Sequence, residues 1–293
     1  LLNESGMQNH PLTPMTDANL VRVMQAQTKR KVGLIDYKTV AQGEAAIRTR
    51  IAVLRAEGVG VAVVDATSND DLHLLGPALK GMPFVTAGSG VAIGLPGNWG
   101  LQSSPQASAL PTAQGYQAIV SGSCSLATQG QVAHYKTTGL PSWQFEPLNW
   151  NSTNVQQQIK ADVEKALSWA KPLLANGPVL IYATTDAETL QKVQAKFGRE
   201  QAGEWMESAL AQVSLGLQAL GVKQWVIAGG ETSGACVQAL NISQMQIGAQ
   251  IDPGVPWCYA PQHAAGHLTL KSGNFGTPDF FTKALKILSE TCA

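Results

Sequence analysis

Three turns built from small and polar residues carry most of the chemistry that this sequence offers. Each directly follows a short strand-like run: residues 121–125 follow Gln117–Val120, residues 229–235 follow Trp225–Ala228, and residues 271–276 follow His267–Leu270. A strand that enters a helix through a glycine turn leaves backbone N–H groups unpaired at the helix N-terminus, where they bind phosphate. Glycine suits such a turn because it accepts positive φ and leaves room for a ligand. Three such turns on one sheet predict a shared crevice for a nucleotide or another phosphate ligand.

The side chains of these turns are the candidates for contact with the ligand. Hydroxyl groups bind phosphate oxygens or metal-bound water. Glu231 is a candidate for Mg²⁺ or for a ribose hydroxyl, because phosphate repels a carboxylate unless a cation lies between them. The predicted cofactor-binding residues are Ser123, Ser125, Gly229, Gly230, Glu231, Thr232, Ser233 and Gly273. Two candidates for catalysis stand beside them: Lys271, which would offset charge during phosphoryl transfer, and Asp252, in a rigid Asp-Pro-Gly turn.

Each of these residues also has an ordinary structural role open to it. Serine and threonine are frequent helix caps, and capping and phosphate binding are compatible at one helix start. Glu231 and Lys271 also fit solvated turns, and Asp252 fits an Asx-type turn. No P-loop pattern and no G-x-G-x-x-G at a strand end is present. The turns by themselves therefore leave the ligand open.

The first third of the chain predicts a βαβαβ unit. Strand-like runs at 31–35, 59–64 and 84–86 alternate with a helix at 44–57 and with a second helix capped by Ser68 or Asn69. Such a unit has parallel strands, with ligands at their carboxyl ends. The candidates there for binding a small acid are His10, Asp65, Gly88, Ser89 and Gly90.

The rest of the sequence predicts a linker followed by a second α/β domain. Residues 95–115 are rich in Pro, Gly, Ser, Gln and Ala, which is typical of a linker. Beyond them, 178–182 and 225–228 read as buried parallel strands, and long helices are expected at 155–174 and 204–220. A helix after Ser125 would carry Thr128 and Gln131 on one face. We expect an α/β protein with two Rossmann-like domains and largely parallel sheets, residues 1–105 and 106–293.

Composition excludes several classes of partner. Lys and Arg together number 20, as do Asp and Glu, and charged residues are only 14% of the 293, so nothing favours nucleic acid or an anionic membrane. No apolar stretch approaches the roughly 20 residues of a membrane span, and the N-terminus lacks a signal-peptide layout. The four cysteines, without C-x-x-C spacing, fit reduced thiols in the cytoplasm. The oligomeric state stays open, with a homodimer as one option.

Several motifs in order resemble the four-carbon acid sugar kinase family. In the second half they are Ser-Gly-Ser-Cys-Ser at 121–125, Gly-Glu-Thr-Ser-Gly-Ala at 230–235, Asp-Pro-Gly-Val-Pro-Trp at 252–257 and Lys-Ser-Gly-Asn-Phe-Gly at 271–276. In the first half they are the segment from Glu4 to Met15, Val-Asp-Ala-Thr at 64–67 and Gly-Ser-Gly at 88–90. The resemblance covers nearly the whole chain.

The resemblance implies a kinase that uses ATP and Mg²⁺ to phosphorylate the 4-hydroxyl of a four-carbon acid such as 3-oxo-tetronate. It implies ATP contacts at Ser123 or Ser125, along Gly230 to Ser233, and at Gly273. Residues 1–105 would then be the later part of a substrate domain with its linker, since the family's opening Asp-Asp-Phe-Thr-Gly-type motif is absent here. Two alternatives stay open: a NAD-dependent hydroxy-acid oxidoreductase and a non-catalytic nucleotide-binding module.

Overall fold

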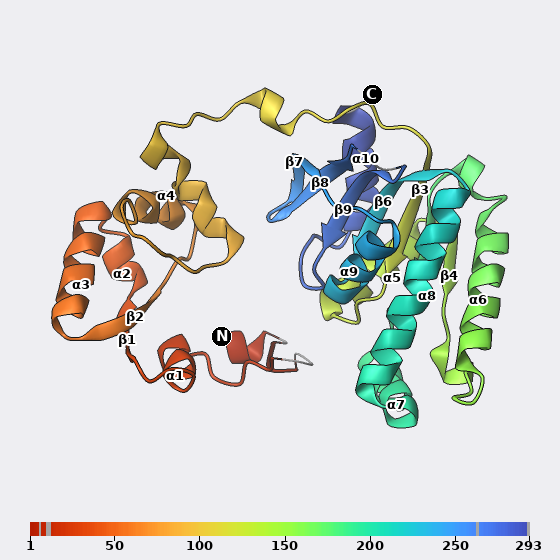
Figure 1. Ribbon diagram of the computed structural model, residues 1–293, viewed down its shortest axis with the longest axis horizontal. Coiled ribbons are helices and arrows are strands. Elements are labelled where there is room, and N and C mark those ends of the chain that lie inside the picture. Colours follow the sequence, from red (N-terminus) through yellow and green to blue (C-terminus); the bar gives the residue numbers. More distant parts are fainter. Residues whose placement is uncertain (6, 10–12, 262–263, 292–293) are drawn as a thin grey trace. The chain divides into compact units, whose positions relative to one another are not determined.

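A computed structural model describes residues 1–5, 7–9, 13–261 and 264–291, and the chain divides into two compact units, Leu1–Ser103 and Ser104–Ala293. Both units combine helices with parallel strands, which confirms the α/β class and the two-domain organisation expected from the sequence (Figure 1). No helix within the described ranges is both long enough and apolar enough to span a bilayer.

The first unit is built on one pair of parallel strands. Its strands are β1 (Lys31–Ile35) and β2 (Val59–Val64). Its helices are α1 (Leu20–Gln25), α2 (Tyr37–Val40), α3 (Glu44–Ala56) and α4 (Asn69–Ala78), with 3₁₀ turns η1 (Leu2–Glu4), η2 (Met7–Asn9), η3 (Ser89–Gly94) and η4 (Pro96–Trp99). The core consists of Ile35, Val40, Ile47, Leu54, Leu75 and Ala78.

Helix α4 begins where the sequence predicted. The Ser68 hydroxyl accepts a hydrogen bond from the Asp71 amide at 3.3 Å, and the Asp71 carboxylate accepts one from the Ser68 amide at 3.0 Å. This reciprocal pair is a capping box, which satisfies two amides that the helix itself leaves free.

The strand expected at 84–86 is not formed, so this part of the prediction was wrong. Residues 84–86 have no regular structure, and the Phe84 side chain is 78% exposed. Pro83 removes a backbone donor directly before the run, and no described strand offers a partner ladder. The first unit is therefore a βαβ unit followed by helices and turns.

The second unit contains a seven-stranded sheet in the order β4-β5-β3-β6-β9-β8-β7. The strands are β3 (Tyr116–Ser121), β4 (Ser142–Gln144), β5 (Val179–Tyr182), β6 (Val222–Ala228), β7 (Gln246–Asp252), β8 (Val255–Ala260) and β9 (Gly266–Lys271). Neighbours from β4 to β9 pair in parallel, whereas β8 pairs antiparallel with both β9 and β7. The β7–β8 hairpin was not predicted, because the Asp-Pro-Gly turn between the two strands dominated the local pattern.

Helices cover both faces of this sheet. They are α5 (Leu126–Thr137), α6 (Val155–Ala170), α7 (Ala187–Phe197), α8 (Arg199–Ala219), α9 (Gly230–Ala239) and α10 (Phe280–Thr291), with η5 (Pro105–Ser108), η6 (Pro147–Asn149) and η7 (Leu174–Asn176). One core cluster joins the sheet to α6, α8 and α9, and the other joins it to α5 and α10 (Figure 1). Alternate residues of β6 enter the two clusters, Trp225 and Ile227 the first and Val226 and Ala228 the second. Because both faces are buried, the middle of β3, β5 and β6 is apolar without alternation, at Ala118–Val120, Val179–Ile181 and Trp225–Ala228.

Candidate functional site

The three turns singled out in the sequence meet at one edge of the second sheet. They follow β3, β6 and β9, which are adjacent and parallel, so their carboxyl ends lie side by side. Backbone hydrogen bonds join the turns: the Gly122 amide donates to the Ala228 carbonyl at 2.9 Å, and the Gly229 amide donates to the Lys271 carbonyl at 2.8 Å. We call residues 121–125 the first loop, 229–233 the second and 272–277 the third.

Glycines allow the loops to approach this closely. A Cβ on Gly273 would lie 2.5 Å from the Ser123 hydroxyl and 3.0 Å from that of Ser125. Gly229 has a φ of +128°, and a Cβ there would lie 2.8 Å from Thr232 Oγ1. A side chain at Gly229 would clash and would be strained by the positive φ, and one at Gly273 would force the two serine side chains to shift, so glycine lets the loops pack this closely.

The first loop is tied to the third through Ser125. The Ser125 hydroxyl accepts the Thr128 amide at 3.2 Å, which caps α5, and donates to the Gly273 carbonyl at 2.6 Å. Ser123 lies beside it, with its hydroxyl 3.3 Å from that of Ser125. Capping and loop positioning are thus combined in one side chain.

The second loop opens α9 with free donors. The amides of Gly230, Glu231 and Thr232 have no acceptor among the described residues, as expected for the first turn of a helix. Thr232 and Ser233 are buried, and the Ser233 hydroxyl has no hydrogen-bond partner in the described part of the chain. A buried hydroxyl without a partner is costly unless a ligand completes it. This end of α9 therefore fits a phosphate group.

Lys271 lies beneath the loops rather than on their surface. Its side chain is fully buried, and Nζ donates to Thr128 Oγ1 at 2.9 Å and to the carbonyls of Ser272 and Gly273 at 3.0 and 3.1 Å. Burial lowers the pKa of Lys271 to about 8. All three ammonium donors therefore have acceptors within the protein.

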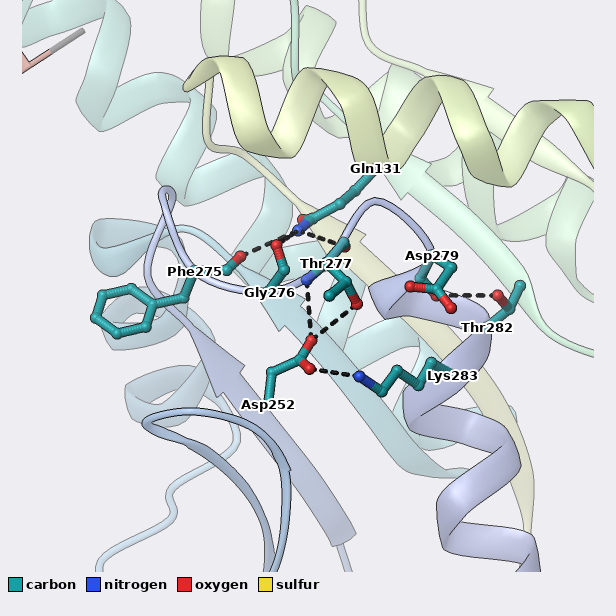
Figure 2. Close-up of polar contacts among 8 residues, drawn as sticks. All are labelled: Gln131, Asp252, Phe275, Gly276, Thr277, Asp279, Thr282 and Lys283. Atoms are coloured by element: carbon teal, nitrogen blue, oxygen red, sulfur yellow. Dashed lines mark hydrogen bonds and ion pairs between the residues drawn. The ribbon is translucent and has the colours of Figure 1, made fainter. Parts of the chain in front are cut away.

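Asp252 fastens the far end of the third loop (Figure 2). Its carboxylate accepts the Thr277 amide at 2.9 Å and the Thr277 hydroxyl at 3.0 Å, and it pairs with Lys283 of α10. Although burial acts to raise the pKa of Asp252, the hydrogen bonds from Lys283 and Thr277 outweigh it and lower the pKa. Asp252 thus joins the β7–β8 hairpin to the loop and to α10.

Gln131 of α5 holds the same segment from the opposite side. Its Nε2 lies 3.0 Å from the Phe275 carbonyl and 3.1 Å from those of Gly276 and Thr277 (Figure 2). Gln131 and Thr128 share the buried face of α5, as their three-residue spacing predicted. Their partners in the third loop lie more than 140 residues further along the chain, so no local pattern indicates these contacts.

The surroundings of Glu231 are acidic. Glu231 is exposed in the first turn of α9. Burial raises the pKa of Glu207 on α8, and the carboxylates of Glu231 and Glu204 raise it further. Across the described ranges no three His, Cys, Asp or Glu side chains gather as a metal cluster. The donor set fits Mg²⁺ only if nucleotide oxygens and water supply most of its ligands, as is usual for this ion.

One polar position at the same edge was missed. The Thr184 hydroxyl lies 2.7 Å from that of Ser121, at the end of β5 next to the first loop. The signal was present, since Ala-Thr-Thr-Asp at 183–186 follows an apolar strand just as the three chosen turns do.

The predicted substrate residues lie in the first unit. Asp65 follows β2 and accepts the Tyr37 amide at 3.2 Å, and the turn at Gly88, Ser89 and Gly90 leads into η3, which packs on α4. No hydrogen bond between described residues joins Asp65 to that turn. His10 lies outside the described residues. The role of these positions in binding an acid stays a prediction.

The loops at the carboxyl ends of three neighbouring parallel strands, with helix amides and a buried serine that lack partners among the described residues, have the features of a phosphate-binding α/β protein. Comparison with known proteins agrees: residues 118–281 match the family described as a nucleotide-binding C-terminal domain, and residues 1–95 match a sugar-binding N-terminal domain.

Curated relatives and solved structures are similar to this chain over nearly its whole length. The 3-oxo-tetronate kinase of Burkholderia multivorans is 50% identical over 98% of this chain and 66% of its own length, and that of Pectobacterium atrosepticum is 39% identical over 98% and 68%. A solved structure from Salmonella typhimurium LT2 is 36% identical with a TM-score of 0.77, and covers 98% of this chain and 67% of the other. A Haemophilus influenzae protein is 37% identical with a TM-score of 0.63, over 98% and 68%.

The chain belongs to the four-carbon acid sugar kinase family. It spans about two thirds of the length of the curated relatives that it matches.

Proposed function

We propose that this chain is the MgATP-binding part, with a portion of the sugar-binding domain, of a kinase that phosphorylates the 4-hydroxyl of a four-carbon sugar acid such as 3-oxo-tetronate. The observation that carries the proposal is the meeting of three glycine loops at the ends of β3, β6 and β9. The chain is also 50% and 39% identical to two of the named kinases over 98% of its length.

In this proposal the second loop binds the phosphates. The free amides of Gly230, Glu231 and Thr232 and the unpartnered Ser233 hydroxyl would receive phosphate oxygens. Glu231 would hold Mg²⁺ together with the nucleotide, which supplies the charge neutralisation that phosphoryl transfer requires.

The first and third loops complete the ATP site. Ser123 and Gly273 lie against each other, so a phosphate held by one loop lies close to the other. Lys271 and Asp252 would act by shaping the third loop, since the structure gives each of them partners inside the protein. Transfer to the acid would be direct, and the loops would promote it by positioning the reactants. The acid would be presented by the sugar-binding portion, with Asp65 and Gly88 to Gly90 as candidate contacts.

A thermal shift measurement of the 293-residue chain with MgATP, MgADP and NAD tests the nucleotide site. A ligand that binds only the folded state raises the melting temperature by mass action. We expect a rise with either adenine nucleotide and none with NAD, whereas a rise with NAD alone would favour an oxidoreductase.

Release of ADP then separates a kinase from a module that only binds nucleotide. The chain, and in parallel a protein of the relatives' full length, would be mixed with MgATP and 3-oxo-tetronate, threonate or erythronate. Acid-dependent formation of ADP supports the proposal, and MgATP binding without any transfer by the full-length protein would refute the kinase assignment.

A further inference from the structure

Five of the six carbonyl groups of the third loop accept hydrogen bonds from two side chains. The donor atoms are Nζ of Lys271 and Nε2 of Gln131. The accepting carbonyls are those of Ser272 and Gly273 for Lys271, and those of Phe275, Gly276 and Thr277 for Gln131. The hydroxyls of Ser125 and Thr128 also donate to the Gly273 carbonyl, at 2.6 and 2.8 Å.

The planarity of the peptide bond fixes where the amides point. In a trans peptide the carbonyl of one residue and the N–H of the next point in opposite directions. The N–H groups of Gly273 and Gly276 therefore point away from Lys271 and Gln131, and neither has an acceptor among the described residues. Thr277 shows the same geometry, because its N–H points away from Gln131 and donates to Asp252 (Figure 2).

The orientation of the Gln131 amide leaves its oxygen without a hydrogen bond from any described residue. Its Oε1 is buried and has no partner in the described part of the protein, while the two hydrogens of Nε2 are shared among three carbonyls. Rotating the amide by half a turn would set Oε1 against those three oxygens, so the observed orientation is the favourable one.

We propose that Gln131 and Lys271 are positioning residues that fix the polarity of the third loop, so that its outward amides at Gly273 and Gly276 bind the phosphates of the nucleotide. The inference rests on the proposed function and adds Gln131, Thr128 and Gly276 to the machinery of that site. Gln131 and Lys271 act through the loop and do not touch the ligand.

Lys271 makes this arrangement sensitive to pH. The ammonium group donates three hydrogen bonds, one with each of its protons, and deprotonation removes one of these hydrogen bonds. The titratable charged groups on the elements packed around it are Lys223 of β6, His134 and Lys136 of α5, Asp252 of β7, Glu231 of α9, and Lys283, Lys286 and Glu290 of α10. None of them contributes to the lowered pKa of Lys271, which burial alone causes.

Binding of MgADP to the 293-residue chain, measured by calorimetry at pH 7, tests the role of Gln131. Gln131→Met keeps the length of the side chain and removes the donor, and Gln131→Glu presents oxygen to the three carbonyls. Gln224→Met is the matched control, since it removes another buried glutamine that donates to a carbonyl, that of Gly115, at the opposite edge of the sheet. We expect about a tenfold loss of affinity for Gln131→Met, a larger loss for Gln131→Glu and none for the control.

The pH profile of MgADP affinity is a readout that a merely structural role would not change. Affinity of the unmodified chain should fall about fivefold from pH 7 to pH 9.5, and Lys271→Met should abolish this dependence while Gln131→Met retains it. Wild-type affinity in both folded Gln131 variants, or a flat profile in the unmodified chain, would overturn the inference. If the unmodified chain binds no MgADP at any pH, the proposed function itself fails and this inference falls with it.

Discussion

Replacing Lys271 by methionine should change how the stability of the protein depends on pH. The lysine is fully buried, and no ion pair between described residues includes it. The folded protein therefore holds an ammonium group without a compensating carboxylate. A methionine of similar length removes that charge.

The sign and size of the effect follow from linkage between protonation and folding. The pKa of Lys271 is about 8 in the folded protein, against 10.5 for a free lysine. Between these values the unfolded chain binds the additional proton, so the free energy of unfolding rises with pH. At about 1.4 kcal/mol per pKa unit, stability should rise by about 2 kcal/mol between pH 7 and pH 9.5 through this group alone.

Urea denaturation at several pH values between 7 and 9.5 measures this quantity. The difference in unfolding free energy, wild type minus Lys271→Met, should shift by about 2 kcal/mol in favour of the wild type as the pH rises. Lys160→Met, at an exposed position on α6, is the control and should leave the difference flat. A flat difference for Lys271→Met as well would show that the ammonium is not desolvated, and would refute the electrostatic reasoning.

Three further predictions concern the loops. Gly273→Val should abolish MgATP binding in calorimetry and also lower the melting temperature, because its side chain would meet two serine hydroxyls. Gly230→Val should abolish binding without unfolding the chain, because nothing lies within 4 Å of an added Cβ. MgATP binding to Gly230→Val would contradict the site assignment. Ser233→Ala should leave stability in urea unchanged, since the hydroxyl has no partner, but weaken MgATP binding severalfold; equal affinity would separate Ser233 from the phosphates. Asp252→Asn should cost about 2 kcal/mol in urea denaturation through its loss of charge opposite Lys283, and an unchanged midpoint would rule out that contribution.

The sequence predicted the strands and turns that are determined by residues adjacent in the chain. The runs at 117–120, 225–228 and 267–270 are strands that pair in parallel as neighbours, and the glycine turns after them meet at one edge of the sheet. Each of these features depends on neighbouring residues, through a strand-like run or a glycine at its end. The α/β class follows from the same patterns.

Features that depend on distant partners were not predictable in this way. Asp252 was a candidate for catalysis or for an Asx-type turn, whereas its partners are Thr277 and Lys283, 25 and 31 positions away. The run at 84–86 has strand-like composition but no partner strand, and a strand exists only when another backbone completes its hydrogen bonds. Local pattern measures propensity, and tertiary contacts decide whether the propensity is realised.

The sheet order has a consequence for how ligand binding is driven. Strands β3, β6 and β9 each have neighbours on both sides, so the loops that leave them are anchored in the most protected part of the second unit. The hydrogen-bonded amides at the ends of these strands, such as those of Gly122 and Gly229, should exchange with solvent only when the whole unit unfolds, rather than by local fraying. These loops then lose their conformational entropy when the chain folds, and not when a ligand binds. A phosphate that bound to these loops would therefore meet amides already in place, and little of its binding free energy would be spent on arranging the protein.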